Sequence, residues 1–269
     1  MILSDLHTHT VYGDGKNTPE EMISEAVKTG MESIGFSEHA YTPFDLSYCM
    51  SGEDTLKYRD EIYNLKELYS GKINIFCGIE KDLYSEDCNK YDYVIGSVHY
   101  VKKDGAYLEV DGSASDFEKI INEYYGGNAM KFVGDFFEQA SLVPQKTKCD
   151  IVGHFDLITK FNDGNVFFDI DSAEYKSLAA EAVREAAKSN PIFEVNTGGI
   201  SRGYKKNPYP SKFILDEILN CGCRVMLSSD SHTTKNLCFG FSEAAELLKE
   251  CGFKSIEYMV ADGFKSVQI

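Results

Sequence analysis

The sequence predicts an α/β fold, a barrel of alternating strands and helices within one domain. Short apolar runs alternate with segments of helical periodicity along the chain, a pattern typical of parallel strands joined by helices. The length of 269 residues fits one such barrel, because barrels of roughly 250 residues commonly form a single domain. We see no internal repeat, low-complexity tract or interdomain linker. Residues 1–269 are therefore expected to form one unit.

The first half of the chain supplies four expected strands, at residues 2–6, 33–36, 72–79 and 93–98. A first helix is expected at residues 18–30, because Thr18 is a favoured N-cap and Pro19 suits the first helical turn. A polar insertion that contains Pro43 and several tyrosines follows the second strand. A second helix is then expected at residues 54–69.

The second half continues the same alternation. Four further strands are expected, at residues 150–152, 191–195, 224–227 and 255–259. Helices are expected around them, at residues 115–140, 172–189, 211–220 and 242–251. This order of elements predicts a parallel sheet covered by helices.

The chain is strongly acidic, with 27 Lys and Arg against 43 Asp and Glu and a net charge of −16. Such a surface repels polyanions, so we expect no nucleic-acid partner, whereas a local cationic pocket could still bind a small anionic substrate. No run approaches the ~18 consecutive apolar residues of a membrane span. Asp5, His7 and His9 stand where a signal peptide would be apolar. We therefore expect a cytoplasmic protein without a membrane partner.

The eight cysteines are scattered along the chain, with one C-x-C pair and no C-x-x-C motif. In a long chain without an export signal, such cysteines are typically reduced thiols packed in the interior. We expect no disulfide framework and no cysteine metal ligand.

The histidines carry the strongest functional signal. All six stand at or just after the carboxyl end of an expected strand: His7, His9, His39, His99, His154 and His232. Glu80 and Asp230 occupy equivalent positions. Carboxyl ends of parallel strands meet on one face of a barrel, where enzymes of this architecture build their active sites. Because imidazole and carboxylate suit zinc, manganese or iron, the sequence predicts a metal centre on that face.

Spacing supports the same interpretation. His7 and His9 are two residues apart on an extended segment, so their rings point to the same side. Asp230 and His232 repeat that spacing. A single histidine at a strand end is more often an ordinary packed or surface residue. The joint placement of all six with two carboxylates is what favours metal binding.

These motifs, in this order, resemble the polymerase and histidinol phosphatase (PHP) superfamily. They are DLHTHT at 5–10, SEH at 37–39, GIE at 78–80, SVH at 97–99, GH at 153–154 and SDSH at 229–232. The resemblance spans nearly the whole chain. It implies a distorted seven-stranded (β/α) barrel and a site for three divalent ions, with zinc, manganese and iron all left open as their identity.

The resemblance also implies a ligand set. The first ion would be bound by His7, His9, Glu80 and Asp230, the second by Glu80, His99 and His154, and the third by Asp14, His39 and His232. Glu80 would thus bridge two ions. Some family members carry a histidine near position 14, so Asp14 is a departure from their pattern.

Within the superfamily the resemblance is closer to the histidinol-phosphate phosphatases. It rests on GHFDLITKF at 153–161 and EVNTGGISR at 194–202, followed by YPS at 209–211, with departures at Phe155 and in the spacing around Arg202. The implied reaction is hydrolysis of L-histidinol phosphate, a small phosphorylated substrate, to L-histidinol and phosphate in histidine biosynthesis. The alternatives are another phosphoesterase, acting on phosphotyrosine, a nucleotide or a nucleic-acid 3′ end, or a non-catalytic metal-binding domain. The acidity of the chain weighs against a nuclease.

Hydrolysis of a phosphomonoester requires an activated water, charge compensation for the phosphate and a proton for the leaving group. Coordination to a divalent ion lowers the pKa of water towards ~7, and the bridging Glu80 is expected to be essential to the ions that activate it. Arg202 is the first candidate for binding phosphate, because a guanidinium group binds phosphate oxygens in pairs, and Lys160 is the second. The general acid is left open between Asp14, a metal-bound water and another protonated group.

Two further sets of residues have expected roles near the site. Tyr41, Phe44, Asp45 and Tyr48 of the insertion could contact the organic part of the substrate, or could form a lid packed for stability. Asp5 and Glu38 could orient imidazole rings through their N–H groups. A plain solvent-facing position is the alternative for Glu38.

Overall fold

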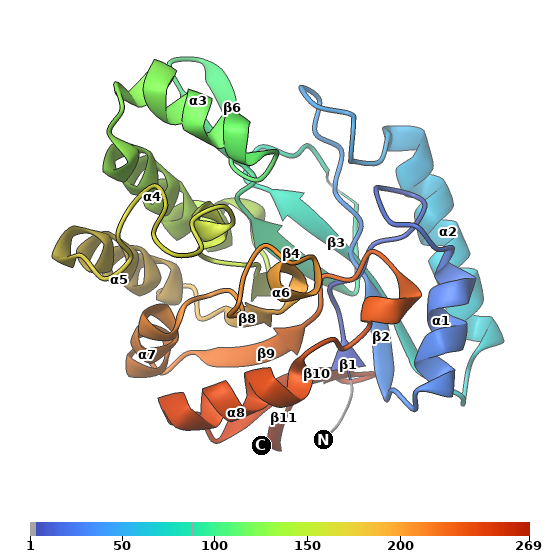
Figure 1. The fold of residues 1–269 in the computed structure, drawn as a ribbon. Helices are drawn as coiled ribbons and strands as arrows, with labels where there is room; N and C mark the ends of the chain where they lie inside the picture. The colour runs from blue at the N-terminus through green and yellow to red at the C-terminus, as the bar shows by residue number, and fades with distance from the viewer. Residues whose placement is uncertain (1–3, 88) are drawn as a thin grey trace.

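The computed structural model describes residues 4–87 and 89–269, and its central feature is a seven-stranded parallel sheet curled into a nearly closed barrel (Figure 1). The strands follow the order β1-β2-β3-β4-β7-β8-β9, and each neighbouring pair is parallel. Their bounds are Ser4–Asp5 (β1), Ser33–Phe36 (β2), Asn74–Asp82 (β3), Tyr93–Ser97 (β4), Ile151–Val152 (β7), Ile192–Asn196 (β8) and Arg224–Ser228 (β9). The barrel predicted from the sequence is confirmed.

The sheet closes where the segment after β1 meets the segment after β9. Thr8 and Ser231 form a parallel bridge. The backbone N–H of His9 donates to the Ser231 carbonyl at 2.8 Å, and the N–H of Ser231 donates to the His7 carbonyl at 3.1 Å. This seam joins chain segments more than 220 residues apart and places His7 and His9 beside the motif that ends in His232.

Helices surround the barrel. Figure 1 shows α1 and α2 on one side and α4, α5 and α7 on the other. As expected, Thr18 caps the first helix, where its side chain accepts a hydrogen bond from the backbone N–H of Glu21. The helices are α1 (Pro19–Lys28), α2 (Gly52–Leu68), α3 (Ala114–Tyr125), α4 (Ala129–Thr147), α5 (Ala173–Ala187), α6 (Gly198–Ser201), α7 (Lys212–Asn220) and α8 (Phe241–Cys251), with short 3₁₀ turns at Leu157–Thr159 (η1) and Thr234–Asn236 (η2).

The prediction of one helix at residues 115–140 was wrong, because two helices, α3 and α4, occupy this region. Gly126 and Gly127 separate them with φ angles of 61° and 82°. These left-handed conformations end a helix and favour glycine. The pair of glycines was the signal in the sequence that marked the break.

Two antiparallel hairpins lie outside the barrel sheet. The strand expected at residues 255–259 forms β10 (Ser255–Val260), but it pairs with β11 (Gly263–Gln268) instead of joining the barrel. The second hairpin, β5 (Tyr100–Lys103) and β6 (Ala106–Glu109), was not predicted. It follows β4 closely and lies between His99 and Asp111, two residues that line the pocket described below.

On the inward face of the barrel, apolar residues come first along the strands, and polar residues gather towards the carboxyl ends. On β3, Phe76 belongs to an inner apolar cluster, and Gly78, Glu80 and Asp82 follow it at steps of two. The other members of that cluster are Leu6, Tyr93, Ile95, Ile151, Ile192, Met226 and Met259. Gly78 makes room for the Tyr93 ring, since a Cβ at this position would lie 2.2 Å from it. The interior is thus packed beneath the carboxyl ends, and its polar groups gather above.

No helix in the described part of the chain combines the length and apolar character that crossing a membrane requires. The seven cysteines that the structure describes are free thiols, as expected. Cys88 lies outside the described residues, as does the beginning of the first expected strand, residues 2–3.

Candidate metal centre

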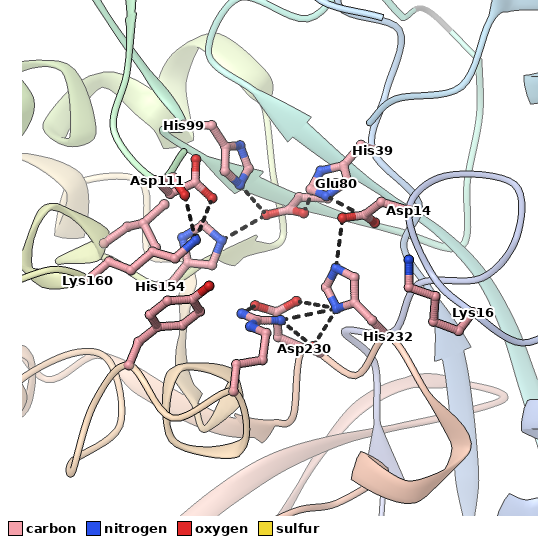
Figure 2. Close-up of a pocket in the computed structure, with 13 residues that line it drawn as sticks. Asp14, Lys16, His39, Glu80, His99, Asp111, His154, Lys160, Asp230 and His232 are labelled. Carbon is pink, nitrogen blue, oxygen red and sulfur yellow. Dashed lines mark hydrogen bonds and ion pairs between the residues drawn. The ribbon is translucent and has the colours of Figure 1, made fainter. Parts of the chain in front are cut away.

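The carboxyl ends of the strands surround a pocket of about 360 Å³. It is lined by Asp14, Lys16, His39, Glu80, His99, Asp111, His154, Leu157, Lys160, Arg202, Tyr204, Asp230 and His232. Figure 2 shows how these side chains converge from loops on opposite sides of the barrel. His7 and His9, both fully buried, lie close to Glu80 and Asp230. The structure therefore brings together all nine residues predicted as metal ligands.

Glu80 stands at the centre because backbone pairing continues beyond the end of β2. The N–H of Glu80 donates to the Glu38 carbonyl at 3.0 Å, and the N–H of Ala40 donates to the Glu80 carbonyl at 2.8 Å. This pairing holds His39 beside Glu80, with 3.0 Å between His39 Nδ1 and Glu80 Oε2. The regular sheet geometry thus fixes the relative position of two site residues that are far apart in sequence.

The first group of possible metal ligands consists of His7, His9, Glu80 and Asp230. Glu80 Oε2 lies 3.2 Å from His7 Nε2 and 3.7 Å from His9 Nε2. Asp230 Oδ1 lies 3.8 Å and 3.5 Å from the same two nitrogens. Two ligands that share a tetrahedral ion at about 2.1 Å are roughly 3.4 Å apart. The spacing of these four atoms matches that requirement.

The other oxygen of Glu80 faces a second group. Glu80 Oε1 lies 3.0 Å from His154 Nε2 and 3.4 Å from His99 Nε2. In a third group, Asp14 Oδ2 lies 3.1 Å from His232 Nε2, and Asp14 Oδ1 lies 3.9 Å from His39 Nε2. Glu80 is therefore shared between two groups of imidazoles, while Asp14 connects the remaining pair.

Several buried atoms at the centre have no hydrogen bond among the described residues. They are Nε2 of His7, both ring nitrogens of His9, Oδ1 of Asp14, Oε2 of Glu80 and Nδ1 of His99 and His154. Buried polar atoms of folded proteins are normally satisfied by a partner. Of these atoms, Nε2 of His7 and His9, Oδ1 of Asp14 and Oε2 of Glu80 lie at ligand spacing from other nitrogen and oxygen atoms of the site, which is the arrangement that a divalent ion requires. The residues present fit such ions.

The charges of the site act on one another. Burial alone would raise the pKa of Glu80, but His7, His99 and His39 hold it well below its usual range, so this carboxylate is ionised. Burial lowers the pKa of His9 to about 3, and His39 and His232 add to the shift. A neutral imidazole is the form that coordinates a metal ion. Glu80 and His9 are therefore both in their ligating state at neutral pH.

Three side chains that support the centre were not predicted from the sequence as functional residues. Glu194 accepts a hydrogen bond from His7 Nδ1 at 2.5 Å, Ser97 donates to Glu80 Oε1 at 2.6 Å, and Asp82 accepts the backbone N–H of His99 at 2.7 Å. Asp82 stands two residues after Glu80 on β3, so the period of the strand could have revealed it. Glu194 similarly faces inwards two residues after Ile192, which belongs to the inner cluster.

The expected role of Asp5 in orienting an imidazole ring was wrong. Its carboxylate accepts hydrogen bonds from the backbone N–H and hydroxyl of Ser229 and from the backbone N–H of Cys238. Asp5 therefore fastens β1 to the segment after β9, at the barrel seam. Glu38 is fully buried, not solvent-facing, and accepts from the N–H and hydroxyl of Thr10, with 3.9 Å between its Oε2 and His9 Nδ1.

The two cationic residues predicted to bind phosphate both line the pocket, and both have protein partners. Arg202 donates to Asp230 Oδ2 at 2.8 Å and to the Asp230 carbonyl at 3.0 Å. Gly198 leaves room for the Arg202 side chain, because a Cβ at position 198 would lie 2.8 Å from Arg202 Nη2. Lys160 Nζ donates to the Asp111 carbonyl at 2.6 Å and lies 3.4 Å from Asp111 Oδ2.

The insertion after β2 packs against the β5–β6 hairpin. The Phe44 ring stacks on Tyr107 with 3.7 Å between ring centroids, and Asp45 Oδ2 accepts from the Tyr100 hydroxyl at 2.8 Å. Tyr48 places its ring edge-on to His39 at 4.8 Å. Among the described residues that line the pocket, none comes from Tyr41, Phe44, Asp45 or Tyr48. These contacts favour the packed lid over direct contact with the substrate.

Comparison with known proteins agrees with this architecture. Residues 5–198 match the family model described as the PHP domain. A protein of Schizosaccharomyces pombe named probable histidinol-phosphatase is 29% identical over 93% of this chain and 87% of its own length. The histidinol-phosphatase of Bacillus subtilis is 26% identical over 91% of this chain and 99% of its own length.

A solved structure has the same fold. It is the histidinol phosphate phosphatase of Lactococcus lactis subsp. lactis Il1403, complexed with zinc, L-histidinol and phosphate. The TM-score is 0.73, with 22% sequence identity over 98% of each chain. The seven-stranded barrel is thus common to both proteins.

Proposed function

The chain belongs to the PHP domain family, and on this basis we propose that it hydrolyses L-histidinol phosphate to L-histidinol and phosphate with the help of divalent metal ions. The observation that carries the proposal is Glu80, whose two oxygens face two different groups of imidazoles at ligand spacing. The curated relatives named histidinol-phosphatase match nearly the whole chain, not one segment of it.

Three ions fit the grouping of the donor atoms. In this proposal His7, His9, Glu80 and Asp230 would hold the first, Glu80 with His99 and His154 would hold the second, and Asp14 with His39 and His232 would hold the third. Bound divalent ions supply Lewis acidity, which activates water and compensates the charge of phosphate oxygens. Zinc, manganese and iron all suit this donor set, and zinc is the metal in the Lactococcus lactis structure.

Asp14 fits a ligand better than a proton donor. Burial would raise its pKa, but a hydrogen bond to His232 and the charge of His39 hold it below its ordinary value. The carboxylate is therefore ionised at neutral pH and has no proton to give to a leaving group. In the reaction it would help His39 and His232 to hold the third ion.

The walls of the pocket carry both positive and negative side chains, and Lys160 and Asp111 lie side by side. Arg202 and Lys160 bring positive charge to the phosphate, and the hydrogen bonds of Arg202 to Asp230 fix the guanidinium at the edge of the metal groups. Asp111 is the one lining carboxylate that belongs to none of the four potential metal-ligand groups of the described residues. It supplies a negative charge that suits the amino group of histidinol. The substrate then lies with its phosphate at the metal groups and its amine towards Asp111.

The site also supports one domain over residues 1–269. The family match ends at residue 198, yet Arg202, Asp230 and His232 come from the segment beyond it. β9, which belongs to that later segment, pairs with β8 inside the matched residues, and the chain after β9 closes the barrel against the chain after β1. A separate unit after residue 198 would leave both the barrel and the site incomplete.

The proposal is tested by phosphate release from a panel of histidinol phosphate, p-nitrophenyl phosphate, a nucleotide and a phosphotyrosine peptide. Each is assayed after chelation and again after zinc, manganese or iron is restored, with Glu80→Ala beside the wild type. A preference for histidinol phosphate that requires metal and Glu80 supports the proposal. A preference for another ester overturns the substrate, and no metal-dependent hydrolysis of any ester overturns the enzymatic function.

A further inference from the structure

Three cationic side chains line the pocket, and they differ in what they contact. Arg202 is bound to Asp230 and Lys160 to Asp111, so each shares its charge with a protein carboxylate. Lys16, the third, makes no side-chain hydrogen bond and no ion pair with any residue of the ranges 4–87 and 89–269. Lys16 therefore leaves a positive charge at the edge of the pocket that no carboxylate of the described residues neutralises, and such a charge attracts anions.

The backbone places Lys16 next to the third metal group. Its N–H donates to the His232 carbonyl at 2.9 Å, and Asp14 stands two residues earlier in the same turn. That turn is held to the segment that follows β1, because the N–H of Gly15 donates to the Thr10 carbonyl at 3.0 Å. Figure 2 shows the side chain beside Asp14 and His232. The backbone of Lys16 is thus held in place, while its side chain is exposed.

We propose that Lys16 binds a phosphate oxygen of the substrate and of the product, and so completes a phosphate subsite with Arg202. The inference rests on the proposed phosphomonoester hydrolysis and names a further substrate-binding residue for it. A lysine ammonium is a compact point charge on a flexible stem, which suits a phosphate that arrives from solvent and must leave again. Because Lys16 contacts the phosphate both before and after the bond breaks, it contributes to binding more than to the chemical step.

The experiment compares Lys16→Met with Lys235→Met by titration of inorganic phosphate into the metal-loaded protein in a calorimeter. Lys235 is exposed, lies three residues after His232 and does not line the pocket, so its replacement removes the same charge nearby. Lys16→Met is expected to weaken phosphate binding about tenfold, the effect of losing one partly exposed charge-assisted hydrogen bond. Steady-state kinetics should show KM raised by a similar factor and kcat changed by less than about threefold.

Two further measurements distinguish a loss of the Lys16 charge from a loss of bound metal. Lys16→Arg should restore most of the phosphate affinity, and metal content should be equal in wild type and variants. Phosphate affinity of Lys16→Met equal to that of wild type and Lys235→Met, in an enzyme that still hydrolyses phosphomonoesters, would overturn the role of Lys16 and leave the proposed function standing. A wild-type protein that neither binds phosphate nor hydrolyses the esters would overturn both.

Discussion

The Nδ1 atom of His7 lies 2.5 Å from Oε1 of Glu194, and both side chains are fully buried beneath the pocket. The other oxygen of Glu194 accepts the backbone N–H of His154 at 2.7 Å. One carboxylate therefore supports a histidine from each of the two groups that share Glu80. Burial would raise the pKa of Glu194, but His7 holds it below its ordinary value, so the carboxylate is ionised and fixes the proton of His7 on Nδ1. The other ring nitrogen, Nε2, points to Glu80 and Asp230, where a bound metal ion would take the place of its proton.

This relationship predicts that Glu194→Gln weakens metal binding although the residue contacts no ion. The amide keeps the shape of the side chain but removes the charge that sets the tautomer of His7, and changes of this kind typically cost 10–100-fold in metal affinity. Chelator competition, followed by metal analysis of the protein, measures the loss. Glu138→Gln on the outer surface of α4 is the matched control. Equal metal retention in both variants would show that Glu194 only packs the barrel interior.

Replacement of Glu80 is predicted to weaken the binding of more than one ion, and so to cost more than Glu194→Gln. Its Oε2 faces His7 and its Oε1 faces His154, so Glu80→Ala removes a donor from two groups at once. We expect loss of more than one equivalent of metal per chain and a fall of at least about a thousandfold in kcat/KM, since several kcal/mol of charge stabilisation disappear. Metal analysis and steady-state kinetics on the same preparation measure both. Loss of only one equivalent would contradict a bridging role.

The residues brought together at this centre were largely predictable because two periodicities in the sequence agree. His7 and His9 share a side of an extended segment, and each later histidine follows a strand of the parallel sheet by two to four residues. In a parallel barrel this suffices to place them on one face. The apolar layer below them, with Ile192 and Met226 on the same inward face, follows from the same alternation.

Residues whose role depends on long-range packing were not predictable in this way. Glu194 is one of 43 acidic residues, and only the closed barrel shows that it reaches His7 across the interior. Asp111 reaches the pocket because the unpredicted β5–β6 hairpin carries it there. Asp5 stands close to two histidines in sequence, yet its hydrogen bonds go to Ser229. Proximity in sequence was a poor guide where the chain returns after more than 200 residues.

Asp5→Ala is predicted to destabilise the barrel seam. Ser229 and Cys238 would lose their buried acceptor, which costs about 1–3 kcal/mol of the free energy of unfolding. Urea unfolding of metal-stripped protein measures this cost free of any change in metal affinity, and Asp60→Ala on the exposed face of α2 is the control. Equal stability of the two variants would contradict a role for Asp5 in closing the barrel.

The cost of the same substitution is predicted to depend on pH. Burial raises the pKa of Asp5 from its ordinary 3.8 to about 6, despite the hydrogen bonds from Ser229 and Cys238. Between these values the folded state holds the proton more tightly than the unfolded state, so the contribution of Asp5 to stability is largest below about pH 4 and falls as the pH rises towards 6. The loss in Asp5→Ala should therefore be larger at pH 4.5 than at pH 7. A larger loss at pH 7 would contradict a raised pKa of Asp5 in the folded state.

Removal of the metal ions is predicted to lower thermal stability as well as activity. The buried carboxylates of Glu80 and Asp230 then keep only their protein partners, which are imidazole, guanidinium, hydroxyl and amide groups. At a free metal concentration a thousand times the Kd, binding contributes about 4 kcal/mol, which corresponds to roughly 10 °C in Tm for a chain of this size. Differential scanning calorimetry before chelation, after it, and after zinc, manganese or iron is restored measures the effect. An unchanged Tm would mean that the ions do not bind the folded centre tightly.

Asp111→Asn is predicted to change substrate preference without disabling the metal centre. The variant keeps the backbone carbonyl that binds Lys160 at 2.6 Å, but it removes the carboxylate that we propose for binding the amine of histidinol. We expect kcat/KM for histidinol phosphate to fall about tenfold, the effect of one lost charge-assisted contact, and kcat/KM for p-nitrophenyl phosphate, which has no amine, to stay within about threefold. Asp163→Asn, which pairs with Lys206 outside the pocket, should leave both values unchanged. Parallel losses on the two substrates in Asp111→Asn would instead mean that Asp111 acts through the position of Lys160, and that the amine is recognised elsewhere.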